Sequence, residues 1–421
     1  MYMFKFIHAA DIHLDSPLRG LEQYEGAPTQ QIREAARRAL ANLVELAVQE
    51  HVAFVIIAGD LYDGDWRHFN TGLYFIDQAR KLQNSGIDVY LIAGNHDAAN
   101  RMTKSLNLPT NVTFFASDAP STVYIKELHV AIHGQSFASA AVSTDLSESY
   151  PLAHASAFNI GILHTCASGR EGHERYAPCS VEGLKLKGYD YWALGHIHLR
   201  ETLCERPFIA FSGNIQGRHI RETGPKGCLL VTVSNDYAVK TEFRPLDVVR
   251  WEIVQVDVSA ATTIEEVLTY TSDAIESRYR NAAGRTLAIR IELTGQTAVH
   301  DALNAKRNYV INEFRSLASQ IGRGEAWIEK VKVNTSKLAS GRTSGMISDD
   351  AMGELGNLFD ELKANPTKLD EFKVDLSDCL RKLPGELKES LPPTDPDWIQ
   401  GVIAEAESRL FQELLSKESN P

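Results

Sequence analysis

One pattern occurs five times in this sequence: a short apolar run that ends in a polar residue able to bind metal. The clearest example is residues 54–63, where an apolar run is followed by Gly59 and Asp60. Apolar runs of this length are typical of buried strands, and open α/β sheets place their ligands beyond the carboxyl ends of such strands. We therefore expect one edge of a sheet to form a metal site. The residues at the five run ends are Asp11, His13, Asp60, Asn95, His96, Asp97, His164, His196 and His198.

The segments between these runs predict an α/β fold with two layered sheets and helices outside. Residues 31–50 and 70–84 have apolar residues at helical spacing, and the first helix joins two of the predicted strands in a β-α-β unit. Residues 112–134 and 208–248 change to short strands without long helices between them. Such a chain predicts two sheets packed face to face.

Length and composition indicate several domains in a reducing compartment. The chain has 421 residues, more than one core usually serves, with the 43% hydrophobic and 23% charged residues of a soluble globular protein. No apolar run approaches the roughly 20 residues of a membrane helix, and the first residues do not resemble a signal peptide. The five cysteines are widely spaced without a Cys-x-x-Cys motif, so we expect a cytoplasmic protein with no thiolate metal site.

The net charge of −12 argues at first against a nucleic-acid partner, because phosphate contacts favour basic surfaces. The acidity is concentrated in residues 345–421, however, which hold 17 acidic and 8 basic residues, a net charge of −9. The rest of the chain holds 38 acidic and 35 basic residues. Bound divalent cations would also reverse the sign of the charge in a cleft lined by carboxylates. A nucleic-acid substrate therefore stays open.

The motifs follow the order of a known superfamily. They are Asp11-x-His13, Gly59-Asp60-x-x-Asp63, Gly94-Asn95-His96-Asp97, His164 and Gly195-His196-x-His198, and over about residues 1–245 they resemble the calcineurin-like metallophosphoesterases. Within that superfamily, Tyr176-Ala177-Pro178 and residues 190–198 resemble the DNA-repair exonuclease branch. This branch contains the nuclease subunit of the bacterial SbcCD complex and its double-strand-break repair counterparts. One Asp-x-His motif would mean little, but five blocks in family order make coincidence improbable.

The resemblance implies a site with two divalent metal ions bridged by Asp60. Two ions about 3.5–4 Å apart can clamp the attacking and leaving oxygens of a phosphodiester. Oxygen and imidazole ligands without thiolate favour Mn²⁺, with Fe²⁺, Zn²⁺ or Mg²⁺ as alternatives. The resemblance assigns to one ion Asp11, His13, Asp60 and His198, and to the other Asp60, Asn95, His164 and His196.

The resemblance gives His96 a different role, because the family uses the histidine after the asparagine ligand to contact the scissile phosphate and protonate the leaving oxygen. An imidazolium suits this task near neutral pH. Asp97 would orient His96 if the loop folds its carboxylate back towards the ring. Asp63 caps the following helix or contacts metal, and capping is the preferred alternative. The alternative for His96 is a solvent-facing turn residue.

Two further segments are candidate substrate contacts. His173 lies in residues 167–175, a glycine-containing loop expected near the cleft. Residues 211–227 are dense in glycines, amides and bases, so backbone N–H groups, Arg218, Arg221 and Lys226 are predicted to contact phosphates. The alternative for this second segment is a solvated turn with one structural Arg–Glu pair at Glu222.

The chain divides into a metallophosphoesterase domain (1–247), a capping domain (248–335), a linker (336–345) and an acidic helical tail (346–421). In the second of these, residues 254–258, 287–293 and 327–333 predict strands, and residues 264–275 and 299–321 predict helices. This β-α-β-α-β order resembles the domain that restricts access to the active site of the repair nucleases. The alternative is a small domain that serves only dimer or partner contacts. In the tail, prolines separate three amphipathic helical patterns.

These features predict a Mn²⁺-dependent DNA exonuclease, with endonuclease activity as an additional mode, in DNA repair or processing. The alternatives are a phosphatase, a small-nucleotide or RNA phosphodiesterase, and a DNA-tethering subunit with dispensable cleavage. No Gly-x-x-x-x-Gly-Lys-Ser/Thr motif occurs in the chain, so an SbcC-like coiled-coil ATPase that binds the tail is the expected motor. The resemblance also implies a homodimer through residues 70–84, where Tyr74 and Phe75 would be surplus apolar area.

Overall fold

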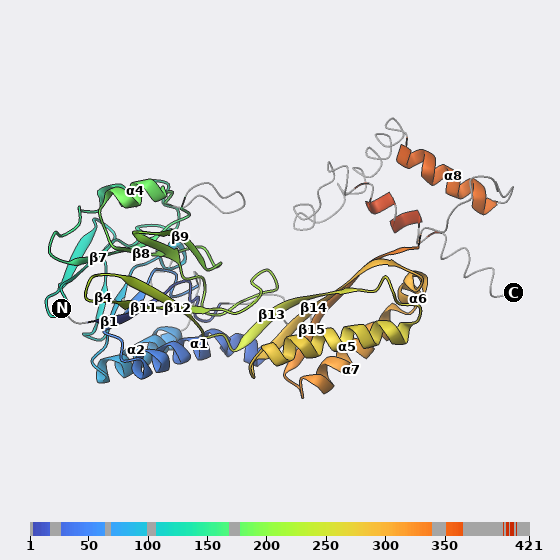
Figure 1. Ribbon diagram of the computed structural model, residues 1–421, viewed down its shortest axis with the longest axis horizontal. Coiled ribbons are helices and arrows are strands. Elements are labelled where there is room, and N and C mark those ends of the chain that lie inside the picture. The colour runs from blue at the N-terminus through green and yellow to red at the C-terminus, as the bar shows by residue number, and fades with distance from the viewer. Residues whose placement is uncertain are drawn as a thin grey trace. The chain divides into compact units, whose positions relative to one another are not determined.

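The computed structural model of the chain (Figure 1) describes residues 3–16, 27–63, 69–98, 107–167, 177–338 and 351–364, and residues 399, 401–403, 405–407 and 410. The chain forms two compact units, Met1–Leu338 and Ala339–Pro421. The first unit contains three sheets.

The first sheet has six strands in the order β12-β11-β1-β2-β3-β4. The strands β1 (Phe4–Ala9), β2 (Phe54–Ile57), β3 (Asp88–Leu91) and β4 (Val112–Phe114) are parallel. The strands β11 (Gly227–Val233) and β12 (Val239–Pro245) extend the sheet in antiparallel pairs. Two amphipathic helices, α1 (Thr29–Gln49) and α2 (Phe69–Asn84), cover one face, because each buries its apolar stripe against the sheet.

The second sheet packs on the other face of the first. Its order is β5-β6-β7-β8-β10-β9, with β5 (Ser121–Ile125), β6 (Val130–Gly134), β7 (Phe158–His164), β8 (Tyr191–Gly195), β9 (Glu201–Glu205) and β10 (Phe208–Phe211). Aromatic rings fill the space between the sheets: Phe4 meets Phe158 edge-on, and Phe6 meets Tyr191 in the same way. The helix α4 (Val181–Leu186) and the 3-10 helix η3 (Leu146–Ser149) border the outer face. The predicted α/β fold class, with two sheets and helices outside, is confirmed.

The third sheet lies in the region predicted as the capping domain and has three parallel strands, β13 (Val249–Asp257), β14 (Thr286–Thr297) and β15 (Ala326–Lys337). The helices α5 (Ile264–Asn281) and α7 (Arg307–Ile321) bury Ile275 and Phe314 against Ile289 and Ile291 of β14. The single long helix expected over 299–321 is instead two helices, α6 (His300–Ala305) and α7. The reason is that Lys306 leaves the helical conformation, with φ −106° and ψ 27°.

An apolar cluster joins the capping domain to the rest of the first unit. Ile32 and Ala35 of α1 and Ile220 of a loop pack there with residues of the third sheet, namely Val249, Trp251, Ala288 and Trp327. Trp251 and Trp327 meet edge-on, with ring centroids 6.3 Å apart.

Helix α2 differs from the prediction in its apolar residues. Phe75 is only 3% exposed and packs in the core with Tyr62. Tyr74 packs against α1, where its hydroxyl donates to the Arg37 carbonyl (2.7 Å) and the Arg37 guanidinium lies over its ring. The prediction that Tyr74 and Phe75 are surplus apolar area was wrong, because α1 and α2 pack together and bury a wider face. Among the side chains of α2 that the structure describes, Leu73 is the exposed apolar one, at 54%.

The second unit contains α8 (Ala351–Ala364) where the first tail helix was expected. Residues 369–383, the second expected helix, lie outside the described residues, and the described residues between 399 and 410 are helical. Ile399 and Ile403 are buried, whereas Leu358 and Leu410 are 56% and 41% exposed. The strand β15 reaches Lys337, two residues into the predicted linker, and residues 339–345 lie outside the described residues. Among the helices that the structure describes, none is long and apolar enough to span a bilayer.

Candidate metal centre

The predicted ligands lie at the ends of strands from both large sheets. Asp11 and His13 follow β1, Asp60 follows β2, and Asn95 begins the short helix α3 (Asn95–Ala98) after β3. From the second sheet, His164 ends β7, and His196 and His198 follow β8. Because the strands β1, β2 and β3 are parallel, as are β7 and β8, their carboxyl ends present these side chains on one side of the sandwich.

The backbone at these positions is strained. Asp11, His13, Asp60 and His196 have φ values of 52°, 48°, 51° and 99°, a region that non-glycine residues seldom adopt. Such strain is found at functional sites, where the surrounding structure maintains it. Gly94 shows how tightly the loops pack, since a Cβ there would collide with the Asp60 carboxylate and the His164 ring.

The side chains form three groups whose ligand atoms lie within 4.8 Å of one another: Asp11, His13 and His198; His13, Asp60 and His96; and Asp11, Asp60 and His164. His13 Nε2 lies 3.1 Å from His198 Nε2 and 3.9 Å from Asp60 Oδ2. His164 Nε2 lies 3.0 Å from Asn95 Oδ1 and 3.4 Å from Asp60 Oδ2. The structure thus brings together Asp11, His13, Asp60, Asn95, His164 and His198. His196 joins them through its backbone N–H, which donates to Asp11 (3.1 Å), and through its ring, 5.2 Å from that of His164.

The hydrogen bonds behind these side chains fit metal binding. His164 donates from Nδ1 to the Ala58 carbonyl (2.9 Å), so its Nε2 lone pair faces the oxygens of Asn95 and Asp60. The Nε2 lone pair of His164 and the oxygens of Asn95 and Asp60 are all acceptors, so a proton or a cation must lie between them. Burial alone would lower the pKa of His164, but the nearby Asp60 carboxylate favours the protonated ring and raises this pKa to about 9. A divalent ion meets the same need, and metal-binding histidines are typically oriented in this way by a carbonyl or carboxylate.

His198 is oriented by a residue that the sequence did not indicate. Its Nδ1 lies 2.7 Å from Glu222 Oε1, a carboxylate only 7% exposed, and this contact leaves Nε2 to face His13. Burial alone would raise the pKa of Glu222, but the contacts with His198 and Arg218 hold it well below its usual range. Burial, together with Arg218 and the neighbouring histidines, lowers the pKa of His13 well below normal, so its ring is neutral, as a metal ligand must be.

His96 contacts Asp63, not Asp97 as predicted. His96 Nδ1 lies 2.7 Å from Asp63 Oδ1, and this contact raises the pKa of His96 above its usual value. Asp63 also accepts a hydrogen bond from Ser16 (2.5 Å). The residues directly after Asp63, where a cap would act, lie outside the described residues.

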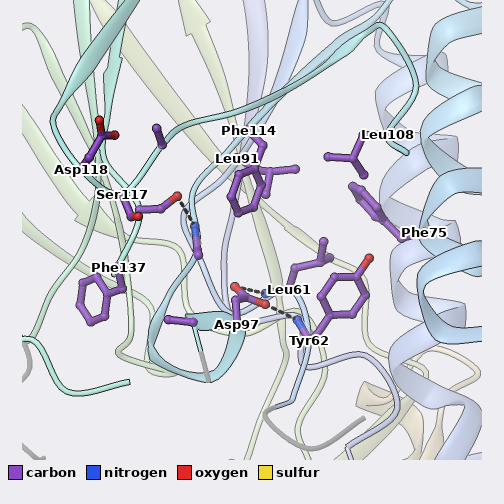
Figure 2. Close-up of a pocket in the computed structure, with 14 residues that line it drawn as sticks. Leu61, Tyr62, Phe75, Leu91, Asp97, Leu108, Phe114, Ser117, Asp118 and Phe137 are labelled. Carbon is purple, nitrogen blue, oxygen red and sulfur yellow. Dashed lines mark hydrogen bonds between the residues drawn. The ribbon is translucent and has the colours of Figure 1, made fainter. Parts of the chain in front are cut away.

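Asp97 has a different task, which Figure 2 shows. Its two oxygens accept from the backbone N–H groups of Leu61 (3.1 Å) and Tyr62 (2.8 Å), as Figure 2 shows. Oδ2 also accepts from the backbone N–H of Gly94 (3.1 Å). Together with Leu61, Tyr62 and Phe137, it lines a pocket behind the loops that carry Asp60 and His96. Asp97 therefore ties two loops of the metal centre together and does not reach the His96 ring.

The predicted substrate contacts have different outcomes. Lys226 is buried, and its ammonium donates to the His198 carbonyl (3.2 Å). Arg218 lies at the centre, with Nη1 3.6 Å from Asp63 Oδ2 and Nη2 3.4 Å from Glu222 Oε1. The Arg–Glu pair kept as an alternative is therefore present, although the glutamate is buried instead of solvated. Arg221 is exposed, and its backbone N–H donates to His219 (3.2 Å). His173 lies outside the described residues.

Comparison with known proteins agrees with this geometry. The family of calcineurin-like phosphoesterases matches residues 4–200, and the middle domain of the metallophosphoesterase YhaO matches residues 251–336. The chain is 32% identical over 372 residues to the uncharacterized metallophosphoesterase YhaO of Bacillus subtilis (strain 168), covering 86% of this chain and 90% of that protein.

Two solved structures are also similar to this chain. One is a dimetal phosphatase from Danio rerio, with 12% identity and a TM-score of 0.35 over 58% of this chain and 96% of the other. The second is GAP50, the anchor in the inner membrane complex of Plasmodium, with 14% identity and a TM-score of 0.35 over 58% of this chain and 85% of the other.

The two-sheet sandwich with a carboxylate, amide and imidazole cluster at its strand ends defines a metallophosphoesterase. The chain belongs to the calcineurin-like phosphoesterase family, which uses a dinuclear metal centre.

Proposed function

We propose that this protein is a dinuclear-metal phosphodiesterase that cleaves DNA. It acts as an exonuclease with endonuclease activity as an additional mode, as in the DNA-repair exonuclease branch of the family. The observation that carries the proposal is the convergence of three groups of side chains that could hold metal ions, one of which includes His96, whose ring is held by a carboxylate. A phosphatase or a nuclease of another substrate class would use the same centre, so the test must separate substrates.

The ligands divide as the family resemblance implies. The two sets share Asp60, whose two oxygens face different neighbours: Oδ1 accepts from the His96 backbone (2.9 Å), and Oδ2 lies 3.4 Å from His164 Nε2. The sets are Asp11, His13, Asp60 and His198, and Asp60, Asn95, His164 and His196. Two bound ions supply charge neutralisation of the phosphate and activation of the attacking oxygen. Mn²⁺ is the preferred ion because the donors are oxygen and imidazole without thiolate.

His96 is the proton donor for the leaving oxygen in this proposal. Asp63 accepts from Nδ1, so the Nε2 proton is the one that His96 can transfer. Arg218 is placed to hold a phosphate oxygen, because its guanidinium lies beside Asp63 on the same side of the centre. Arg218 is therefore the first candidate for substrate binding, and Arg221 the second.

A DNA substrate is supported by the surroundings of the centre. The loop that carries Arg218 is hydrogen-bonded to the capping domain through Trp251, so a second domain contacts a loop of the centre. Binding of a small phosphate ester needs no second domain. For a DNA substrate, such a domain can restrict which forms of the polymer reach the metal ions. The strong negative charge lies in the second unit and not in the unit that holds the centre.

The test is cleavage in the presence of Mn²⁺ of end-labelled single- and double-stranded DNA. The generic diester bis-p-nitrophenyl phosphate and the monoester p-nitrophenyl phosphate serve as reference substrates, and Asp60→Asn serves as the inactive control. We expect nucleotide-sized products from DNA ends and hydrolysis of the diester. Hydrolysis of either reference ester without cleavage of any DNA form would reject the DNA substrate and favour a phosphatase or small-molecule phosphodiesterase.

We further propose that the second unit binds an ATPase subunit of the coiled-coil type. The whole chain lacks a Gly-x-x-x-x-Gly-Lys-Ser/Thr motif, so ATP-driven work needs a separate subunit. Leu358 of α8 and Leu410 expose apolar surface on an acidic segment, which suits a protein partner better than a phosphate backbone.

A further inference from the structure

A single residue of the capping domain holds both ends of the loop that supports the metal centre. The indole N–H of Trp251 donates to the Gly217 carbonyl (3.0 Å), and the Trp251 carbonyl accepts from the Gly224 N–H (2.9 Å). Between these points the loop contains Arg218 and Glu222. Trp251 is 3% exposed, so both bonds are made away from water, where they are hardest to replace.

The loop in turn fixes the Glu222 carboxylate. Oε2 accepts from the Arg218 backbone N–H (2.7 Å) and from Asn214 Nδ2 (2.9 Å). Gly217 leaves no room for adjustment, because a Cβ there would collide with the Glu222 carbonyl and crowd the Trp251 ring. The position of the carboxylate therefore depends on where Trp251 holds Gly217 and Gly224.

Glu222 directly contacts His198, one of the predicted metal ligands. Oε1 lies 2.7 Å from His198 Nδ1, which orients the ring whose Nε2 faces His13. The Arg218 side chain, on the same loop, lies 3.6 Å from the carboxylate that holds His96. The loop that contains Arg218 and Glu222 therefore contacts His198 directly and contacts the Asp63 carboxylate that holds His96.

We propose that Trp251 is a positioning residue for the metal centre, which sets the affinity of the ion bound by His198 through Gly217 and Glu222. The inference rests on the proposed function only in taking His198 as a metal ligand. It adds that the capping domain helps to build the site whose loop it contacts. A displacement of the third sheet relative to the sandwich would then change metal affinity as well as access.

The test measures Mn²⁺ binding to the full-length protein by isothermal titration calorimetry, without substrate. Trp251→Phe removes the indole N–H and keeps an aromatic ring in the cluster. Loss of one buried hydrogen bond corresponds to about a fivefold weakening of the ion at His198. Glu222→Gln is the positive control and should weaken the same ion by about 10- to 100-fold, as expected for a residue that orients a ligand.

Ile291→Val is the matched control for stability. It removes a methyl group from the core of the same domain, on the face of β14 that packs on α5 and α7, and makes no contact with the loop. It should lower the melting temperature of the protein without changing Mn²⁺ affinity. If Trp251→Phe does not fold, Gln216→Met replaces it, because Gln216 donates to the Val249 carbonyl (2.6 Å) and attaches the loop to β13 beside the two bonds of Trp251.

The outcomes distinguish this inference from the proposed function. Weakening of one ion in Trp251→Phe, but not in Ile291→Val, supports the inference. Wild-type affinity in Trp251→Phe, or equal weakening in Ile291→Val, overturns it and leaves the proposed function intact. A wild-type protein that binds Mn²⁺ but cleaves no DNA overturns the proposed function and leaves the inference standing.

Discussion

The carboxylate of Asp63 lies 2.7 Å from Nδ1 of His96, and the carboxylate of Glu222 lies at the same distance from Nδ1 of His198. In both pairs the carboxylate fixes which nitrogen carries the proton and leaves Nε2 for the chemistry. His198 Nε2 faces His13 inside the cluster, whereas the His96 ring is 38% exposed at its side chain. Under the proposed function, similar pairs would therefore serve two purposes, one for metal binding and one for proton transfer to substrate.

The division of roles predicts different effects of two substitutions. His96→Ala should keep both metal ions and lower the rate of cleavage by about 10²-fold or more, as expected for loss of a general acid. Asp60→Asn should lose metal as well as activity, because it removes the shared negative charge. Inductively coupled plasma mass spectrometry of the purified variants measures the metal content. Loss of metal from His96→Ala would show that His96 is a ligand, as its place near His13 and Asp60 also allows.

The two aspartates near His96 should behave differently from each other. Asp63→Ala should retain metal and lower kcat by about tenfold or more, since the His96 imidazolium loses a charged partner. Asp97→Ala leaves three buried backbone N–H groups without their acceptor and should cost about 3 kcal/mol or more in the free energy of unfolding. Steady-state kinetics and urea unfolding separate these effects. A kcat loss in Asp97→Ala at unchanged stability would restore the orienting role predicted from the sequence.

The convergence of the predicted ligands could be expected from the sequence because each one ends or follows an apolar run. Burial of those runs as strands requires their ends to meet, so Asp11, Asp60 and His164 converge without knowledge of any loop. The partner of His96 could not be found in this way. Adjacent residues in a helix point in different directions, and His96 and Asp97 both lie in α3, so nearness in sequence indicated the wrong carboxylate.

The remaining differences come from tertiary packing. Glu222 is 24 residues from His198 in a loop without periodicity, and no local signal connects the two. The pattern of α2 predicts Phe75 as surplus apolar area only if α2 packs against one sheet face. In the structure, α1 and Tyr62 also bury Phe75. Helix propensity likewise carries no signal for the break at Lys306, which separates α6 from α7.

The homodimer remains a prediction, and Leu73 is the residue of α2 that can test it. Its side chain is 54% exposed, and α2 belongs to the same unit as the metal centre. We expect a dimer at micromolar concentration by multi-angle light scattering, and Leu73→Glu should shift the protein towards a monomer. Leu186→Glu, at a more exposed leucine of α4 (81%), is the control and should leave the dimer unchanged. A wild-type protein that is monomeric at this concentration would contradict the prediction of a homodimer.

The second unit gives the last prediction, which concerns the ATPase partner. Deletion of residues 346–421 removes most of the compact unit Ala339–Pro421 and a net charge of −9, and leaves the unit that contains the centre. We expect the truncated protein to bind Mn²⁺ and to keep its basal cleavage, but to lose co-purification with a coiled-coil ATPase and any stimulation by ATP.

Two features of the tail make this deletion informative. Ile399 and Ile403 are buried, as in the small bundle that three amphipathic helices can form, while Leu358 and Leu410 are left exposed. Leu358→Glu in the full-length protein should therefore weaken the complex without unfolding the tail, because it changes the exposed residue and not the buried ones. Undiminished complex formation by the truncated protein would sink the proposal. Loss of folding in the truncated protein would show that the tail stabilises the catalytic unit, because a tail that serves only a partner can be removed without that cost.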